Sequence, residues 1–152
     1  MLTPRRVSLI LLALAMGGFA IGTSEFVVMG LITEIARGFG VTEPQVGHVI
    51  SAYALGVVGG APLLAVLGAR LPRRTLLLAL MGFYAVGNLA SALSPSYHAM
   101  MLFRFVAGLP HGAYFGVAAL VAAHVSPPSQ RGKAVGRVML GLAVSLLVGN
   151  PL

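Results

Sequence analysis

The chain has 152 residues, of which 58% are hydrophobic and 9% are charged, and its formal net charge is +7. Soluble domains average about 25% charged residues, so this composition excludes an ordinary soluble domain and is typical of a membrane protein. The sequence contains no cysteine, which excludes disulfides, cysteine-ligated metals and thiol catalysis.

Long stretches without charge predict the membrane-spanning segments. A helix needs about 20 apolar residues to cross about 30 Å of hydrocarbon. The predicted spans, in chain order, cover about 7–31, 46–69, 75–93, 99–123 and 135–152. Glycine and proline inside such long segments argue against barrel strands, which have about 9–11 alternating residues. The sequence therefore predicts an all-α polytopic membrane protein with about five transmembrane helices and no soluble domain.

The first span follows Arg5 and Arg6 and resembles a secretory signal at its start. Its apolar run exceeds the roughly 7–15 residues of a cleaved signal, so we expect a retained helix. Threading the spans through the membrane places eight of the ten basic residues on one side: Arg5, Arg6, Arg70, Arg73, Arg74, Arg131, Lys133 and Arg137. Only Arg37 lies on the other side. The positive-inside rule thus predicts a cytoplasmic N-terminus, with the basic charge facing lipid headgroups rather than nucleic acid.

The segments between the spans carry helix start and stop signals. Thr42 is a predicted N-cap, with Pro44 in the first turn of the second span. Two prolines are expected to stop the helix of the fourth span in the stretch Val125-Ser126-Pro127-Pro128. The fifth span is still apolar at Leu152, so we expect either a truncated protein or a piece of a longer one.

Pairs of glycines four residues apart predict close helix packing, because small side chains let helix backbones approach. Such pairs inside predicted spans include Gly18 and Gly22, Gly56 and Gly60, and Gly108 and Gly112.

Glu25 and Arg104 are the charged residues that lie well inside the predicted spans, whereas Arg137 lies at the basic start of the last one, and an ionisable group in hydrocarbon indicates a functional site. Glu25 lies about six residues, roughly 9 Å, below the external end of the first span. Arg104 lies about five residues, roughly 8 Å, below the same surface. The two charges are therefore predicted to share a depth. They form either a structural ion pair or a proton-binding site that Arg104 tunes.

Three further residues share one face of the fourth span with Arg104, namely Gly108, His111 and Phe115. Because a strip with arginine and histidine is unsuited to lipid, we expect it to line a substrate cavity. His111 either binds substrate or relays protons, or it makes an interhelical hydrogen bond. Asn88 in the third span is a further cavity candidate, although packing between helices explains it as well.

The first span, FAIGTSEFVVMGLITEIA, and the fourth, LFRFVAGLPHGAYFG, resemble the major facilitator superfamily, in its drug- and sugar-efflux proton antiporter branch. The resemblance implies an incomplete N-terminal six-helix half, so that residues 1–152 form a partial N-terminal transporter domain. It also implies a role in proton coupling for Arg104, which adds to the proton-binding role expected of Glu25 from its position in an apolar span. The substrate is expected to be a small organic solute, and the location the bacterial inner membrane.

The same resemblance assigns roles to two other segments. The sequence GARLPRRT is similar to the family's cytoplasmic gating loop at Gly68, Arg70, Arg73 and Arg74, although the characteristic aspartate is missing. The last span is similar to the start of the antiporter motif at Gly141, Gly149 and Pro151. The resemblance implies no enzyme activity, no cofactor and no metal site. Transport is expected to require missing C-terminal helices.

Two alternatives to a working transporter remain. The chain is a truncated product that transports nothing alone, since alternating access needs two halves. Otherwise it is a haem-binding membrane subunit that uses the four histidines, His48, His98, His111 and His124.

Overall fold

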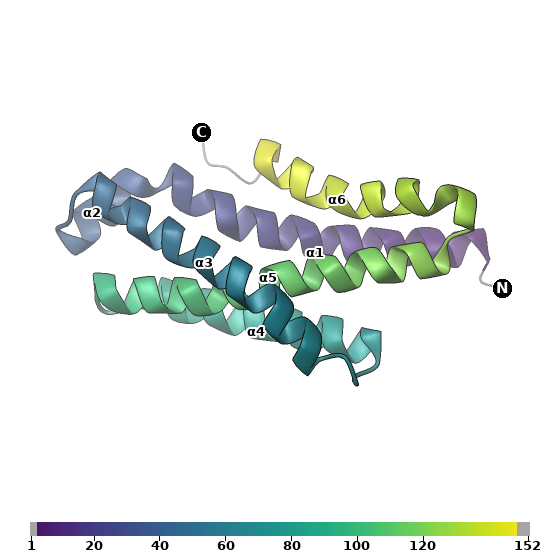
Figure 1. The fold of residues 1–152 in the computed structure, drawn as a ribbon. Coiled ribbons are helices and arrows are strands. Elements are labelled where there is room, and N and C mark those ends of the chain that lie inside the picture. Colours follow the sequence, from purple (N-terminus) through teal and green to yellow (C-terminus); the bar gives the residue numbers. More distant parts are fainter. Residues whose placement is uncertain (1–2, 149–152) are drawn as a thin grey trace. The chain divides into compact units, whose positions relative to one another are not determined.

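The structure, a computed structural model, describes residues 3–148. Within these residues the chain is helical and contains no strand (Figure 1). The elements are α1 (Pro4–Gly30), α2 (Ile32–Phe39), α3 (Glu43–Leu67), α4 (Arg73–Ala92), α5 (Tyr97–Val125), the 3-10 helix η1 (Pro128–Gln130) and α6 (Arg131–Val148). The predicted all-α fold class is confirmed.

Helices α1, α3, α4 and α5 are each long and apolar enough to cross a membrane. Helix α6 has 18 residues, and its first two turns carry Arg131, Lys133 and Arg137, which lower its apolar character. The predicted fifth span, 135–152, runs on into positions that lie outside the described residues.

The outer faces of these helices are apolar. Val58 and Val66 on α3 are 73% and 75% exposed, and Leu147 on α6 is 83% exposed. Soluble proteins rarely expose large contiguous apolar patches, because water solvates them poorly. These faces therefore suit the hydrocarbon of a bilayer.

The chain divides into two compact units, and each is described by itself. The first unit consists of Met1–Val27 with Phe115–Leu152. In it, α6 runs beside α1 (Figure 1), and Gly141 lies against the Ala15 carbonyl of α1. Gly22 lies against Ser145 of α6 in the same way. Small residues thus let these two helices pack closely.

The second unit is Val28–Tyr114 and contains α2, α3, α4 and the first part of α5. Gly56 of α3 lies against the Phe105 carbonyl of α5, and Gly108 of α5 lies against the Tyr53 carbonyl of α3. A Cβ added at Gly87 of α4 would lie 2.9 Å from the Ala107 Cα of α5. The predicted role of the glycine pairs on α3 and α5 in helix packing is confirmed.

The helix ends follow the sequence signals, with one addition. Thr42 is the N-cap of α3, and the Gln45 Oε1 accepts a hydrogen bond of 2.8 Å from the Thr42 N–H. Helix α5 ends at Val125 as predicted. The segment after the first span, for which the sequence analysis gave no helix, forms α2. Gly40 ends α2 with φ 65°, a left-handed conformation that glycine adopts without steric cost.

Candidate functional site

Five polar side chains of the second unit gather where α3, α4 and α5 meet, and we call them the polar cluster. Tyr53 comes from α3, Tyr84 and Asn88 from α4, and Arg104 and His111 from α5. Helix α5 contributes Arg104 and His111 two turns apart on one face. The cluster is thus a polar site inside an otherwise apolar helix packing.

Arg104 is 2% exposed and contacts two other members of the polar cluster. Its guanidinium carbon is 4.4 Å from the centroid of the Tyr53 ring, in a cation–π arrangement. Its Nη1 donates a hydrogen bond of 3.3 Å to the Asn88 Oδ1. Burying a guanidinium among apolar helices is costly, and these contacts offset part of that cost.

His111 is half-buried and joins the cluster through its Nδ1. The Tyr53 hydroxyl lies 2.8 Å from this nitrogen, and the two rings meet edge to face with centroids 5.8 Å apart. The same hydroxyl lies 3.3 Å from the Tyr84 hydroxyl. The Tyr53 side chain therefore contacts both Arg104 and His111.

The periodicity of α3 and α4 explains why both tyrosines face inward. The buried residues recur at intervals of three and four, which places them on one helix face. On α3 they are Val46, Val49, Tyr53, Gly56 and Gly60, and on α4 they are Leu76, Leu80, Tyr84, Gly87 and Ser91. Each tyrosine lies one turn from a glycine on the buried face, where α5 approaches closely.

The structure brings three predicted cavity residues together and places the others elsewhere. Arg104, His111 and Asn88 belong to the polar cluster, whereas Gly108 lies at the contact of α5 with the α3 backbone. Phe115 belongs to the first unit, where a Cβ added at Gly18 would lie 3.1 Å from its ring.

Glu25 is half-buried on α1, five residues before that helix ends at Gly30. It belongs to the first unit, and Arg104 belongs to the second. The shared depth of the two charges therefore stays a prediction from the sequence.

The predicted gating residues surround the link from α3 to α4. Gly68 is buried, and a Cβ added there would lie 2.5 Å from the Leu76 side chain of α4. Arg70, Arg73 and Arg74 are exposed. Of the predicted antiporter residues, Gly141 packs against α1 as described, while Gly149 and Pro151 lie outside the described residues.

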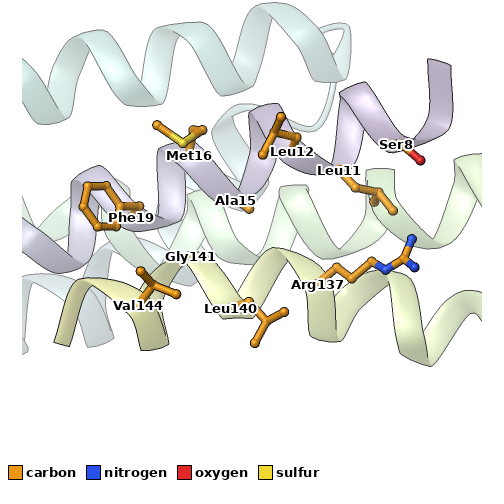
Figure 2. Close-up of a pocket in the computed structure, with 10 residues that line it drawn as sticks. All are labelled: Ser8, Leu11, Leu12, Ala15, Met16, Phe19, Arg137, Leu140, Gly141 and Val144. Carbon is orange, nitrogen blue, oxygen red and sulfur yellow. The ribbon is translucent and has the colours of Figure 1, made fainter. Parts of the chain in front are cut away.

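A groove with a volume of about 530 Å³ lies along α1 and α6 in the first unit (Figure 2). Its lining is apolar apart from Ser8 and Arg137, whose side chains lie toward the same end of the groove (Figure 2). The other lining residues are Leu11, Leu12, Ala15, Met16, Phe19, Leu140, Gly141 and Val144. Gly141 is the one predicted site residue in this lining. The groove is thus an apolar surface, distinct in chemistry from the polar cluster.

Among residues 3–148, no group of three or more His, Asp or Glu side chains lies together to hold a metal ion. Tyr53 and Tyr84 are the site residues that the sequence interpretation missed. Their signal was weak, since a tyrosine in an apolar span also serves as an ordinary packing residue.

Long apolar helices around a cluster of arginine, histidine, asparagine and tyrosine define a polytopic membrane protein with a polar site inside its helix packing. The model of the Major Facilitator Superfamily matches residues 14–152. The chain belongs to this superfamily.

Similar proteins are named as transporters or as a drug-resistance protein. The chain is 46% identical over 141 residues to the "Inner membrane transport protein YdhP" of Escherichia coli (strain K12), covering 93% of this chain and 36% of that protein. It is 35% identical over 145 residues to the "Uncharacterized MFS-type transporter YfhI" of Bacillus subtilis (strain 168), covering 95% and 36%. It is 36% identical over 138 residues to the "Chloramphenicol resistance protein" of Streptomyces lividans, covering 91% and 35%. The chain therefore spans about a third of the length of these relatives.

Proposed function

We propose that this chain supplies one side of the transport site of a secondary transporter that exports a small organic solute in exchange for protons. The polar cluster carries the proposal, because a buried arginine and a half-buried histidine among apolar helices are typical of substrate and proton pathways. Membership of the superfamily favours transport over the haem-binding alternative. The name of the Streptomyces relative favours a drug-like organic solute.

The chemistry of the residues suggests two roles, solute binding and proton binding. Arg104, Asn88 and His111 offer hydrogen-bonding groups to a solute, and Glu25 takes up and releases the coupling proton. A carboxylate in an apolar helix suits that task, since burial opposes its charged form and a nearby cation favours it. Transport then couples to the proton gradient by alternating access of the cavity to the two sides of the membrane.

We further propose a bacterial inner-membrane location with the N-terminus in the cytoplasm. The orientation is supported by the eight basic residues that the predicted topology places on one side of the membrane.

Replacing Glu25 tests the coupling role. The reading frame that contains residues 1–152 is expressed in cells lacking other exporters, and the accumulation of chloramphenicol is followed with and without a proton gradient. We expect Glu25→Gln to abolish gradient-driven export while membrane insertion stays intact. Met29→Leu, at an exposed position of the same helix, is the control. Unchanged export by Glu25→Gln would refute the coupling role.

Arg104 is tested in the same assay. Arg104→Ala is expected to impair export strongly. Arg104→Lys is expected to recover little, because lysine lacks the planar guanidinium that lies over the Tyr53 ring. Full activity of Arg104→Lys would show that a positive charge alone suffices.

A second candidate function concerns the chain by itself. It spans 36% of YdhP, and alternating access needs two halves moving around a central site. We therefore propose that residues 1–152 alone do not transport. Purified chain in proton-loaded vesicles should show no solute movement above protein-free vesicles, and measurable exchange would refute this.

A further inference from the structure

We propose that Tyr53 is a positioning residue of the transport site. Its hydroxyl donates a hydrogen bond to the Nδ1 of neutral His111, so that the His111 proton stays on Nε2, and its ring positions the Arg104 guanidinium. The inference rests on the proposed function only in taking His111 and Arg104 as solute-binding groups. The arrangement itself follows from the contacts of the second unit.

One rigid side chain makes both contacts. Tyr53 is 2% exposed, its ring face lies 4.4 Å from the Arg104 guanidinium carbon, and its hydroxyl lies 2.8 Å from the His111 Nδ1. Ring and hydroxyl move together, since a phenol has no internal rotation that separates them. Any displacement of α3 therefore changes the surroundings of Arg104 and His111 at the same time.

The hydroxyl carries a single hydrogen, which limits how the three groups can bond. If Tyr53 donates to the His111 Nδ1, His111 carries its proton on Nε2, and the Tyr53 oxygen can accept from the Tyr84 hydroxyl 3.3 Å away. If instead the His111 Nδ1 donates, the Tyr53 oxygen is its acceptor. The hydrogen bond between Tyr53 and His111 thus has two possible directions.

The chemistry of the two groups selects the first direction. A phenol O–H is more acidic than the N–H of a neutral imidazole, and an unprotonated imidazole nitrogen is a better acceptor than a phenol oxygen. The Arg104 guanidinium over the ring face draws electron density from the phenol and strengthens its O–H as a donor in this bond. Tyr53 is therefore the donor to Nδ1, and His111 offers an N–H at Nε2. A donor at this position matches a solute that presents an oxygen acceptor, such as a carbonyl, hydroxyl or nitro group.

Nitrogen NMR of the 152-residue chain tests the assignment. The protein is labelled with ¹⁵N-histidine, purified in lipid nanodiscs and measured at alkaline pH, where histidine is neutral. The His111 signal is identified by its loss in His111→Gln. We expect a protonated Nε2 and an unprotonated, hydrogen-bonded Nδ1. A wild-type His111 with the proton on Nδ1 would overturn the proposal.

Two tyrosine variants separate the hydroxyl from general packing. Tyr53→Phe keeps the ring beneath Arg104 and removes the hydroxyl, so the His111 Nδ1 signal should shift and both tautomers should appear. Tyr97→Phe is the matched control, since its hydroxyl also links α5 to α3, through a hydrogen bond of 2.7 Å to the Gln45 carbonyl. That hydroxyl lies 3.5 Å from the His48 Nδ1, so this variant should disturb His48 and leave His111 unchanged. Unchanged His111 signals in a folded Tyr53→Phe protein would overturn the proposal.

Transport supplies the second measurement. In the complete reading frame, Tyr53→Phe should raise the KM for chloramphenicol about tenfold, as expected for one lost positioning hydrogen bond, with little change in maximal rate. Tyr97→Phe should leave the KM unchanged.

If Glu25→Gln abolishes export while Tyr53→Phe alters neither the KM nor the His111 signals, the positioning role is refuted and the proposed function stands. If the His111 signals respond as expected but Glu25→Gln exports normally, the positioning role stands and the coupling role is refuted.

Discussion

Gly59 and Gly60 are adjacent glycines on α3 with opposite surroundings, and they allow the packing of α3 against α5 to be measured. Gly60 is buried, and an added Cβ would overlap the Leu109 carbonyl group of α5. Gly59 is exposed, and nothing lies within 4 Å of its added Cβ. We expect Gly60→Ala to destabilise the second unit and Gly59→Ala to leave it unchanged or slightly more stable.

The size of the difference follows from the contact. The added Cβ of Gly60 would lie 2.6 Å from the Leu109 carbonyl carbon, and ordinary contact begins at 3.4 Å, so the helices must separate by at least roughly 0.8 Å. Overpacking of this kind costs about 1–3 kcal/mol. Replacing glycine by alanine inside a helix also stabilises the helix by about 1 kcal/mol, and this gain is the same at both positions. That gain cancels in the comparison, so the free energies of unfolding should differ by about 1–3 kcal/mol.

The assay is unfolding of the purified chain by SDS in mixed micelles, followed by circular dichroism at the helix band. The transition of Gly60→Ala should lie at a lower SDS fraction than that of Gly59→Ala. Equal transitions for the two variants would refute the close contact of α3 with Leu109.

Two further predictions concern the topology and the start of α3. Because the chain has no cysteine, Gly38→Cys and Gly132→Cys each create a single thiol at an exposed position where an added Cβ meets nothing within 4 Å. In intact cells a membrane-impermeant maleimide should label Gly38→Cys and should label Gly132→Cys only after permeabilisation, and the reverse pattern would refute a cytoplasmic N-terminus. Thr42→Ala removes the N-cap side chain of α3 and should lower the free energy of unfolding by about 1 kcal/mol in the same SDS titration, whereas an unchanged transition would show that the cap contributes nothing.

Much of the fold could be predicted because hydropathy acts locally along the chain. The stretches around α3, α4 and α5 are apolar and bounded by proline, serine or basic residues, so their helices are evident from the sequence. The short helix α2 was missed, although Ile32, Ile35, Ala36 and Phe39 recur with helical spacing. Eight residues with two charges fall below the length at which a hydropathy pattern stands out from a loop.

The candidate site could be predicted only in part. Arg104 and His111 are evident because ionisable residues are rare and costly in apolar helices. Tyr53 carries no such signal, because its contacts with Arg104 and His111 depend on how three helices pack. The relative register of these helices cannot be predicted from the sequence of any single one. The shared depth of Glu25 and Arg104 remains a prediction, because these residues belong to different units.

The packing glycines and the polar cluster of the second unit depend on each other. Gly108 lies against the Tyr53 carbonyl, and Arg104 is one turn before Gly108 on the same face of α5. The close approach of α5 to α3 at Gly108 therefore places the Arg104 guanidinium over the Tyr53 ring. A larger residue at Gly108 would separate the backbones and lift the cation from the ring. The glycine spacing of α5 is thus best understood as part of the geometry of the candidate site, because it sets the distance at which arginine and tyrosine meet.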